Sequence, residues 1–222
     1  MSLQEKLQKR SETFVAETPS EIVNAMLRAD VALISTGLAE HALRAGDVAP
    51  EFTLREVRGN SVSLSTLRRS GPVVINFYRG DWCPYCVLEL EELAALHPEI
   101  DRLGASVVAI SPQKVERLAA YTGVPFALAS DPGSKVARAY GLAFSLPEEL
   151  RPIYQRLGHP LPAVNAASDW VLPLPATYVV ARDGRIALSF VDADYRRRME
   201  PSEILAALSG LPEQSGRSPW RT

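Results

Sequence analysis

Cysteine and histidine are scarce in this chain, and their scarcity argues against several kinds of site. The 222 residues include two cysteines and three histidines. A disulfide framework would need more cysteines, spread further along the chain, and a structural zinc site usually has four ligands. Because His41, His97 and His159 are scattered, zinc held by Cys83 and Cys86 is the less favoured alternative, and we expect no catalytic histidine. We also expect no metal and no organic cofactor.

The chain also lacks a charge excess and a long apolar run. Its formal net charge is −2, which gives no basic footprint for nucleic acid. The first residues are polar and charged, unlike a secretory signal. The longest apolar runs, such as 73–77, have the length of a strand and fall short of the roughly 20 residues that span a bilayer. We therefore expect a cytoplasmic protein without nucleic-acid or membrane partners.

Residues 1–45 are predicted to form a helical extension. In its second helix, Thr18 can act as the N-cap, Pro19 fits the first helical position and Glu21 completes a capping box. The apolar residues that follow recur at helical spacing: Ile22, Ala25, Met26, Ala29 and Leu33. Gly37 is expected to end this helix before a short helix over 38–44. The apolar face needs a cover, which we expect to be the rest of the chain or a second subunit.

Residues 46–212 alternate strand-like and helix-like segments, which is typical of an α/β fold. The predicted strands cover 73–78, 106–111, 126–130, 176–181 and 185–191, the last two joined at Asp183-Gly184. The predicted helices cover 83–97, 113–121, 134–140, 147–157 and 201–208. The continuous apolar strands 73–77 and 107–110 favour a parallel arrangement in the centre of a sheet. Residues 213–222 are expected to be a flexible tail.

The segment from 158 to 175 is a long, Pro- and Ala-rich connection, and connections of this length are often functional. Asn165 and Trp170 lie in it and are candidates to cover a site. Downstream, Arg196, Arg197 and Arg198 form a basic run, for which a solvated face is the expected role.

The strongest chemical signal is the pair Cys83 and Cys86 in the sequence Cys-Pro-Tyr-Cys. The pair follows a buried strand and opens a helix, whose free N–H groups and partial positive charge favour a thiolate. Positions i and i+3 share a helix face, so one sulfur can attack a substrate and the other can close a disulfide. Pro84 suits the first helical turn because it has no N–H to lose. Two inert core cysteines are the weaker interpretation.

Several segments resemble the peroxiredoxin-like proteins of the alkyl hydroperoxide reductase and thiol-specific antioxidant (AhpC/TSA) family, in the thioredoxin superfamily. The matching segments, in order, are 46–54 (GDVAPEFTL), 77–86 (FYRGDWCPYC), 108–113 (VAISPQ), 130–133 (SDPG) and 175–180 (PATYVV). The resemblance spans about 46–209, and the helical extension is also similar to one found in this branch. It implies a thioredoxin-like fold with a central mixed sheet flanked by helices, and thiol-dependent reduction of peroxides.

The sequence departs from the family pattern at two places. Typical peroxiredoxins carry Pro-x-x-x-Thr-x-x-Cys, and on this pattern Cys86 takes the attacking position, with Cys83 in place of Thr and Arg79 in place of Pro. Pro175 stands where they carry Arg and instead resembles the cis proline that faces the thioredoxin dithiol. We therefore expect a cis bond before Pro175. On the thioredoxin pattern Cys83 attacks, and we favour Cys83 because it should face solvent at the helix N-terminus while Cys86 turns inward.

Four further residues are candidates for supporting roles around the dithiol. Arg79 could stabilise a thiolate or an oxyanion, or be a solvated turn residue. Trp82 and Tyr85 flank the cysteines and could form an apolar rim for a partner protein, or be ordinary packing residues. Asp81 could oppose thiolate formation or accept a proton, but the expected role is that of a turn residue.

The predicted function is a thiol-dependent peroxidase, a cytoplasmic oxidoreductase that reduces hydrogen peroxide or an organic hydroperoxide. A thiolate attacks the peroxide, a sulfenic acid forms, and the second cysteine closes the Cys83–Cys86 disulfide. The resemblance implies that thioredoxin or glutathione restores the dithiol, and it leaves a homodimer open. Two alternatives stay open: a protein disulfide reductase that uses Cys83, and a redox-responsive binding protein whose dithiol is a switch.

Overall fold

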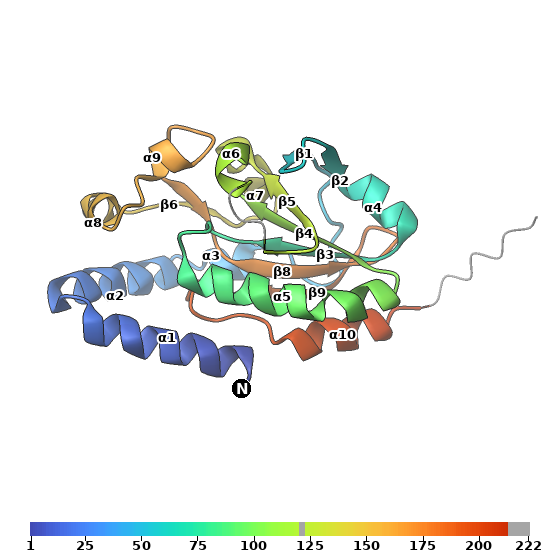
Figure 1. Ribbon diagram of the computed structural model, residues 1–222, viewed down its shortest axis with the longest axis horizontal. Coiled ribbons are helices and arrows are strands. Elements are labelled where there is room, and N and C mark those ends of the chain that lie inside the picture. Colours follow the sequence, from blue (N-terminus) through green and yellow to red (C-terminus); the bar gives the residue numbers. More distant parts are fainter. Residues whose placement is uncertain (120–122, 213–222) are drawn as a thin grey trace, which may run out of the picture.

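The computed structural model describes residues 1–119 and 123–212, and Figure 1 shows its elements. The helices are α1 (Leu3–Glu17), α2 (Ser20–Ser35), α3 (Leu38–His41), α4 (Leu64–Ser70), α5 (Pro84–Arg102), α6 (Val115–Leu118), α7 (Lys135–Ala139), α8 (Arg151–Arg156), α9 (Leu161–Val164) and α10 (Pro201–Ser209), with short 3-10 turns η1 (Pro132–Ser134) and η2 (Glu148–Leu150). The strands are β1 (Thr53–Glu56), β2 (Ser61–Ser63), β3 (Val73–Phe77), β4 (Ser106–Ser111), β5 (Ala127–Ser130), β6 (Ala143–Ser145), β7 (Val171–Pro173), β8 (Ala176–Val180) and β9 (Ile186–Val191).

A mixed sheet forms the centre of the molecule, in the order β2-β1-β5-β4-β3-β8-β9. Strands β3, β4 and β5 run parallel, whereas β8, β9, β1 and β2 pair antiparallel. The fully buried β3 lies between β4 and β8, as its continuous apolar sequence predicts. The predicted α/β fold with a central mixed sheet and flanking helices is therefore confirmed.

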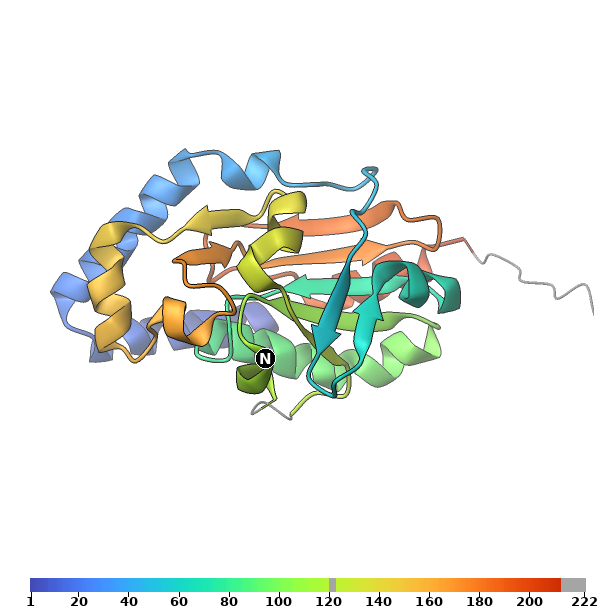
Figure 2. The same cartoon turned by 90° about the horizontal axis from the view of Figure 1, so that it is seen from above.

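Alternate residues of the central strands pack into different cores, because successive side chains of a strand point to opposite faces. On β3, Val73 and Ile75 join the core under α4 and α7, whereas Val74 joins the core under α1, α5 and α10. Figure 1 shows α1 and α10 along the lower side of the molecule, with α5 directly above them in front of β8 and β9. A third, smaller core joins α2 to η2, α8, α9 and β7 at one end of the molecule, as Figure 2 also shows.

The helical extension packs on the rest of the same chain. Leu3 and Leu7 of α1 are buried in the core with α5, and Lys6 forms an ion pair with Glu92 of α5. The carboxylate of Glu200, the N-cap residue of α10, accepts from the Leu3 N–H at 3.3 Å and from the next N–H at 2.8 Å. A carboxylate at a helix N-terminus satisfies free N–H groups and the helix dipole. These contacts tie α1 to both α5 and α10.

The predicted capping box at α2 is wrong, since α2 begins after Pro19 and has no side-chain cap, whereas Ser2 and Glu5 form such a box at α1.

The helical segment Ser20–His41 has the length and mean hydropathy, 1.4, of a membrane-spanning helix, although the sequence showed no such apolar run. The segment contains Arg28 and the buried Asp30, and one of its faces packs into the third core. That pattern is also found in helices that cover a protein core.

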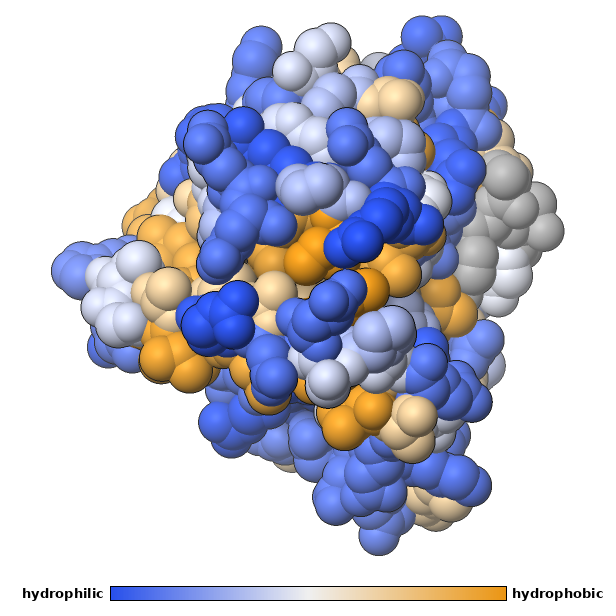
Figure 3. Space-filling model, turned by 90° about the vertical axis from the view of Figure 1, so that its left-hand side faces the viewer, coloured by the Kyte–Doolittle hydropathy of each residue, from blue (hydrophilic) through white to orange (hydrophobic). Residues whose placement is uncertain are grey.

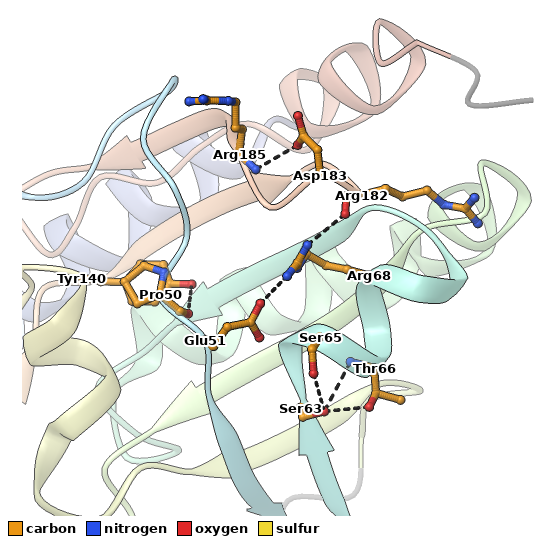
Figure 4. Close-up of polar contacts among 10 residues, drawn as sticks. All are labelled: Pro50, Glu51, Ser63, Ser65, Thr66, Arg68, Tyr140, Arg182, Asp183 and Arg185. Atoms are coloured by element: carbon orange, nitrogen blue, oxygen red, sulfur yellow. Dashed lines mark hydrogen bonds and ion pairs between the residues drawn. The ribbon is translucent and has the colours of Figure 1, made fainter.

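Polar contacts fix the start of the sheet to its far hairpin (Figure 4). Arg68 of α4 forms an ion pair with Glu51 and donates to the Arg182 carbonyl oxygen at 2.9 Å, in the turn between β8 and β9. The Tyr140 hydroxyl donates to the Pro50 carbonyl oxygen at 3.1 Å. The predicted Asp183-Gly184 turn is present, with Gly184 at a φ of 91°.

Several predicted boundaries differ from the structure. The helix predicted over 147–157 is a 3-10 turn followed by α8, because Pro152 lies in the first turn of the α-helix instead of in its middle. The connection 158–175 contains α9 and β7, and β7 pairs with β6 in a separate ribbon. Of the helix predicted over 113–121, residues 115–118 form α6, and 120–122 lie outside the described residues, as does the tail predicted over 213–222.

Candidate active site

The turn from β3 to α5 places the dithiol at the end of a buried strand. Gly80 takes a φ of 151°, and a Cβ there would lie 2.3 Å from the Trp82 indole nitrogen, so only glycine fits. The Cys83 N–H donates to the Gly80 carbonyl oxygen at 3.1 Å and closes the turn. Cys83 is then the N-cap residue of α5, which begins one residue after the predicted helix start, and Pro84 occupies the first helical position as expected.

Asp81 anchors this turn to the strand beside it. Its N–H donates to the Gln113 amide oxygen at 2.9 Å, and its carboxylate accepts from the Gln113 amide nitrogen at 2.6 Å. Arg117 adds an ion pair to the same carboxylate at 3.2 Å. Asp81 is therefore a turn residue with a structural role, and these bonds hold the first turn of α5 in place.

Both cysteines are reduced and buried, with exposed fractions of 2% for Cys83 and 0% for Cys86. Their thiols form a close pair, at 3.4 Å. The expectation that Cys83 faces solvent is wrong, because α1, α2 and the 154–159 segment surround it. The expected proximity of the two sulfurs is met, and a disulfide needs only a small further approach.

The surroundings shift the pKa values of the two thiols in opposite directions. Burial raises the pKa of Cys83, but the hydrogen bond from the Cys86 thiol and the charges of Arg79 and Arg198 outweigh it and lower the pKa to about 5. Burial, the hydrogen bond to Cys83 and the Cys83 charge raise the pKa of Cys86 well above its usual range. Cys83 is thus the thiolate and Cys86 the thiol near neutral pH.

Arg79 is a buried cation, with an exposed fraction of 3%, and not a solvated turn residue. Its guanidinium donates to the Tyr154 hydroxyl and lies over the Tyr195 ring, 4.2 Å from the ring centre. It is also 5.1 Å from the centre of the Trp82 ring. These aromatic faces hold the charge in an apolar site, where it acts strongly on the Cys83 thiolate.

A second buried cation, Arg198, lies beneath Cys86. It donates to the Cys86 sulfur at 3.5 Å and forms an ion pair with Glu89 at 2.6 Å. Thr177 donates to the same carboxylate at 3.3 Å, and Asn76 donates to Thr177 at 3.1 Å. The network therefore links Cys86 to the central strands.

The Glu89–Arg198 pair was not predicted from the sequence. The basic run 196–198 was expected to be solvated, but Arg198 has an exposed fraction of 4% because the segment folds back under α5. Glu89 had one usable signal, since it lies three residues after Cys86 on the same helix face. Burial raises the pKa of Glu89 to about 7, while Arg198 opposes the rise.

A pocket of about 320 Å³ opens onto Cys83. Its walls combine the dithiol turn with the helical extension: Arg10, Phe14 and Met26 from the extension, and Trp82, Cys83 and Tyr85 from the turn and α5. Trp82 stacks on His159, with ring centres 4.9 Å apart, and its indole N–H has no hydrogen-bond partner among the described residues. The extension is therefore part of the wall around the reactive sulfur.

Other predicted site residues are placed differently. The bond before Pro175 is trans, because the described residues contain no cis peptide bond, so the cis prediction is wrong. Pro175 is buried and lines a separate cavity that it shares with Arg79. Tyr85 has an exposed fraction of 4% and cannot form an exposed rim.

Asn165 and Trp170 do not line the pocket at Cys83. Asn165 is buried and donates to the Val171 carbonyl oxygen at 3.3 Å, so it orders its own connection. Trp170 packs against the third core and lies beside Arg151. Their predicted covering role is not seen in this structure.

Comparison with known proteins identifies the family to which this chain belongs. The AhpC/TSA family model matches residues 45–189. The chain belongs to the AhpC/TSA family. The resemblance drawn from the sequence segments is thereby confirmed, and the match leaves α1, α2 and α3 outside the family region.

Individual relatives match over part of their length. The chain is 33% identical to the chloroplastic peroxiredoxin Q of Triticum aestivum over 115 residues, which are 50% of this chain and 52% of that protein. It is 32% identical to the thiol-disulfide oxidoreductase ResA of Halalkalibacterium halodurans over 103 residues, 45% of this chain and 57% of that protein. The crystal structure of peroxidoxin BcpB from Mycobacterium tuberculosis has a TM-score of 0.60 at 24% identity, covering 77% of this chain and 99% of that one, and shows the same fold.

Proposed function

We propose that this protein is a thiol-dependent peroxidase that reduces hydroperoxides at Cys83 and resolves the product with Cys86. The observation that carries the proposal is the division of acidity within one buried dithiol. Cys83, beside Arg79, has a pKa of about 5, and the pKa of Cys86 is raised well above its usual range. A peroxidase of this kind needs one cysteine as a thiolate that attacks the peroxide, and a second that stays a thiol until the sulfenic acid has formed.

In the first step the Cys83 thiolate attacks the terminal oxygen of the hydroperoxide. The S–O bond forms, the O–O bond breaks, and the leaving alkoxide or hydroxide takes a proton from solvent to become an alcohol or water. The charge moves from sulfur to the leaving oxygen beside the Arg79 guanidinium. The unpartnered Trp82 N–H lines the same pocket and offers a hydrogen bond to a peroxide oxygen.

In the second step Cys86 closes the disulfide. Its thiol loses a proton, its sulfur attacks the Cys83 sulfenic acid, and water leaves as the S–S bond forms. Arg198 supports this step because its guanidinium donates to the Cys86 sulfur and stabilises the negative charge that forms there when the thiol loses its proton. Positions i and i+3 at the start of α5 bring the sulfurs together without a second chain.

The cycle closes when an external dithiol donates two electrons and two protons to the disulfide. Thioredoxin is the reductant we propose first, with glutathione as the second candidate, and we propose the cytoplasm as the compartment. A reducing compartment suits a dithiol that must be regenerated after each turnover. The pocket lined by α1 and α2 would have to admit the reductant's sulfur.

A thiol–disulfide reductase is the second candidate, and the similarity to the thiol-disulfide oxidoreductase ResA favours it. One observation counts against it: Pro175, which faces the dithiol in the thioredoxin pattern, does not line the pocket at Cys83. A redox-switch binding protein is the third candidate, in which the dithiol changes state without turnover.

Coupled turnover separates the three candidates. The protein is mixed with peroxide, thioredoxin, thioredoxin reductase and NADPH, and NADPH oxidation is followed with Cys83→Ser and Cys86→Ser as matched controls. We expect turnover that each substitution reduces to near background. Activity on insulin disulfides alone would favour the reductase, and no turnover with either substrate would favour the switch. Near-full peroxide turnover in either variant would overturn the intramolecular disulfide cycle.

A further inference from the structure

A second cavity, of about 470 Å³, is lined by Arg79 but not by Cys83. Arg79, Tyr154 and Tyr195 line both this cavity and the pocket at Cys83, so they form a partition between the two. Cys83 itself lines only the smaller pocket. The larger cavity is therefore separate from the reacting sulfur but shares its cation.

The walls of this cavity are mostly apolar. Helix α2, the β6 region and the segment before β8 supply them: Ala29, Ala32, Leu33, Phe144, Leu150 and Leu174. Its volume falls in the range of roughly 300–1,000 Å³ that small-molecule sites occupy. In Figure 3, which views the end of the molecule where α2 and α8 lie, apolar side chains gather in a band between hydrophilic ones. Such walls suit the apolar body of an organic molecule.

Arg79 gives this apolar cavity a buried positive charge that no carboxylate pairs in the described part of the chain. Its Nε atom is buried without a hydrogen-bond partner among the same residues. Asp30 feels the Arg79 charge but is ion-paired to Arg196, at 3.3 Å. A buried cation without a carboxylate is costly unless an anion faces it. In the reduced protein that anion is the Cys83 thiolate.

We propose that the cavity binds an apolar carboxylate, whose carboxylate group meets Arg79 and whose hydrocarbon part fills the space between α2 and β6. The proposal rests on the proposed function only in taking Cys83 as the thiolate that Arg79 neutralises. In the disulfide form that thiolate is gone and Arg79 has no anion. The carboxylate therefore binds the disulfide form more tightly than the dithiol form, and by linkage it makes the disulfide harder to reduce.

Octanoate is the probe, and 1-octanol is its uncharged counterpart of equal chain length. Binding is measured by calorimetry to the reduced protein and to the disulfide form prepared with diamide, so that no peroxidase activity is needed. We expect octanoate to bind the disulfide form about tenfold more tightly than the dithiol form, within the usual range of coupling between sites. We expect 1-octanol to bind weakly and equally to both forms.

Two variants on α2 test the location. Ala32 lines the cavity, so Ala32→Phe fills its mouth and should abolish octanoate binding, whereas Val31→Phe adds the same ring on the exposed side of the helix and should leave it unchanged. Unaltered peroxide turnover in both variants shows that they are folded. Absence of octanoate binding, equal affinity for the two redox forms, or binding that survives Ala32→Phe would each overturn the proposal. If the wild-type protein binds octanoate as expected but does not turn over peroxide, the proposed peroxidase function is refuted and the binding site is not.

Discussion

At the scale of single residues, two neighbouring thiols acquire different chemistry from the cations around them. Cys83 faces Arg79, and Cys86 lies on the Glu89–Arg198 pair. A helix N-terminus alone would favour a thiolate in both positions, although less so in the second. The buried arginines add a strong attraction because little water screens them.

Replacing Arg79 by Gln should raise the pKa of Cys83 and slow its reaction with peroxide at pH 6. The side chain stays polar but becomes shorter and loses its charge, so the thiolate loses a cation in an apolar site. The thiolate absorbance near 240 nm, followed against pH, measures the pKa, and Arg68→Gln is a control at a surface ion pair. An unchanged titration in Arg79→Gln would show that the cation does not set the acidity of Cys83.

Replacing Glu89 by Gln should affect the second step more than the first. The variant removes the ion-pair partner of Arg198, which then holds the Cys86 sulfur less well. Rapid mixing with one equivalent of peroxide should show Cys83 oxidation within about threefold of wild type and disulfide closure at least tenfold slower, a barrier change of about 1.4 kcal/mol. Equal slowing of both steps would indicate a general structural defect instead of a positioning role.

The sequence predicted the close cysteine pair at the start of a helix but not the charged residues that surround it. The cysteine spacing, the preceding strand and Pro84 are all local features, so the dithiol and its helix could be predicted. The role of Arg198 depends on a segment that returns under α5 after more than 100 residues, a separation of 112 from Cys86. No local pattern reports such a contact, and a run of three arginines looks solvated by itself.

At the scale of elements, α1 and α2 extend the family fold and close over its active site. Leu3 and Leu7 place α1 against α5, and Phe14 and Met26 then line the pocket at Cys83. The sequence predicted that the extension would pack on the rest of the chain or on a second subunit, and the structure shows the first. Its contribution to the pocket wall could not be foreseen, because amphipathic spacing gives the buried face of a helix but not its direction across the sheet.

Leu7→Ala should loosen α1 and expose Cys83 to larger reagents. Leu7 is fully buried, and a Leu→Ala change in a core costs about 2–5 kcal/mol. Alkylation of the reduced protein by a bulky maleimide should become faster, while urea unfolding shifts to lower concentration. Leu27→Ala is the matched control, because Leu27 on α2 is 42% exposed and should change neither value appreciably. A destabilised Leu7→Ala protein with unaltered alkylation would mean that α1 does not limit access.

At the scale of the whole molecule, the buried thiolate links redox state to stability. The folded pKa of Cys83 is about 5 against an ordinary value of 9.0, so folding is favoured wherever the unfolded thiol would bind more protons. This contribution is complete above pH 9, falls as the pH decreases, and is lost below pH 5. At pH 7 it is on the order of 2–3 kcal/mol.

The disulfide form should therefore be less stable than the dithiol form at pH 7. The disulfide closes a loop of only a few residues and restricts the unfolded chain little, whereas oxidation removes the anion that faces Arg79 and Arg198. Urea unfolding of both forms at pH 7 and at pH 5 measures the difference, which should shrink at pH 5. A more stable disulfide form at pH 7 would show that the arginines do not depend on the thiolate.

The central claim of the proposed mechanism is that Cys83 attacks the peroxide and Cys86 resolves the sulfenic acid. The test treats Cys86→Ser and Cys83→Ser with limited peroxide and a sulfenic-acid probe, and locates the label by mass spectrometry. The proposed mechanism predicts rapid labelling of Cys83 in the Cys86→Ser protein and an inert Cys86 in the Cys83→Ser protein. Rapid labelling at Cys86 alone would contradict it and reverse the roles of the two cysteines, as the typical peroxiredoxin pattern has them.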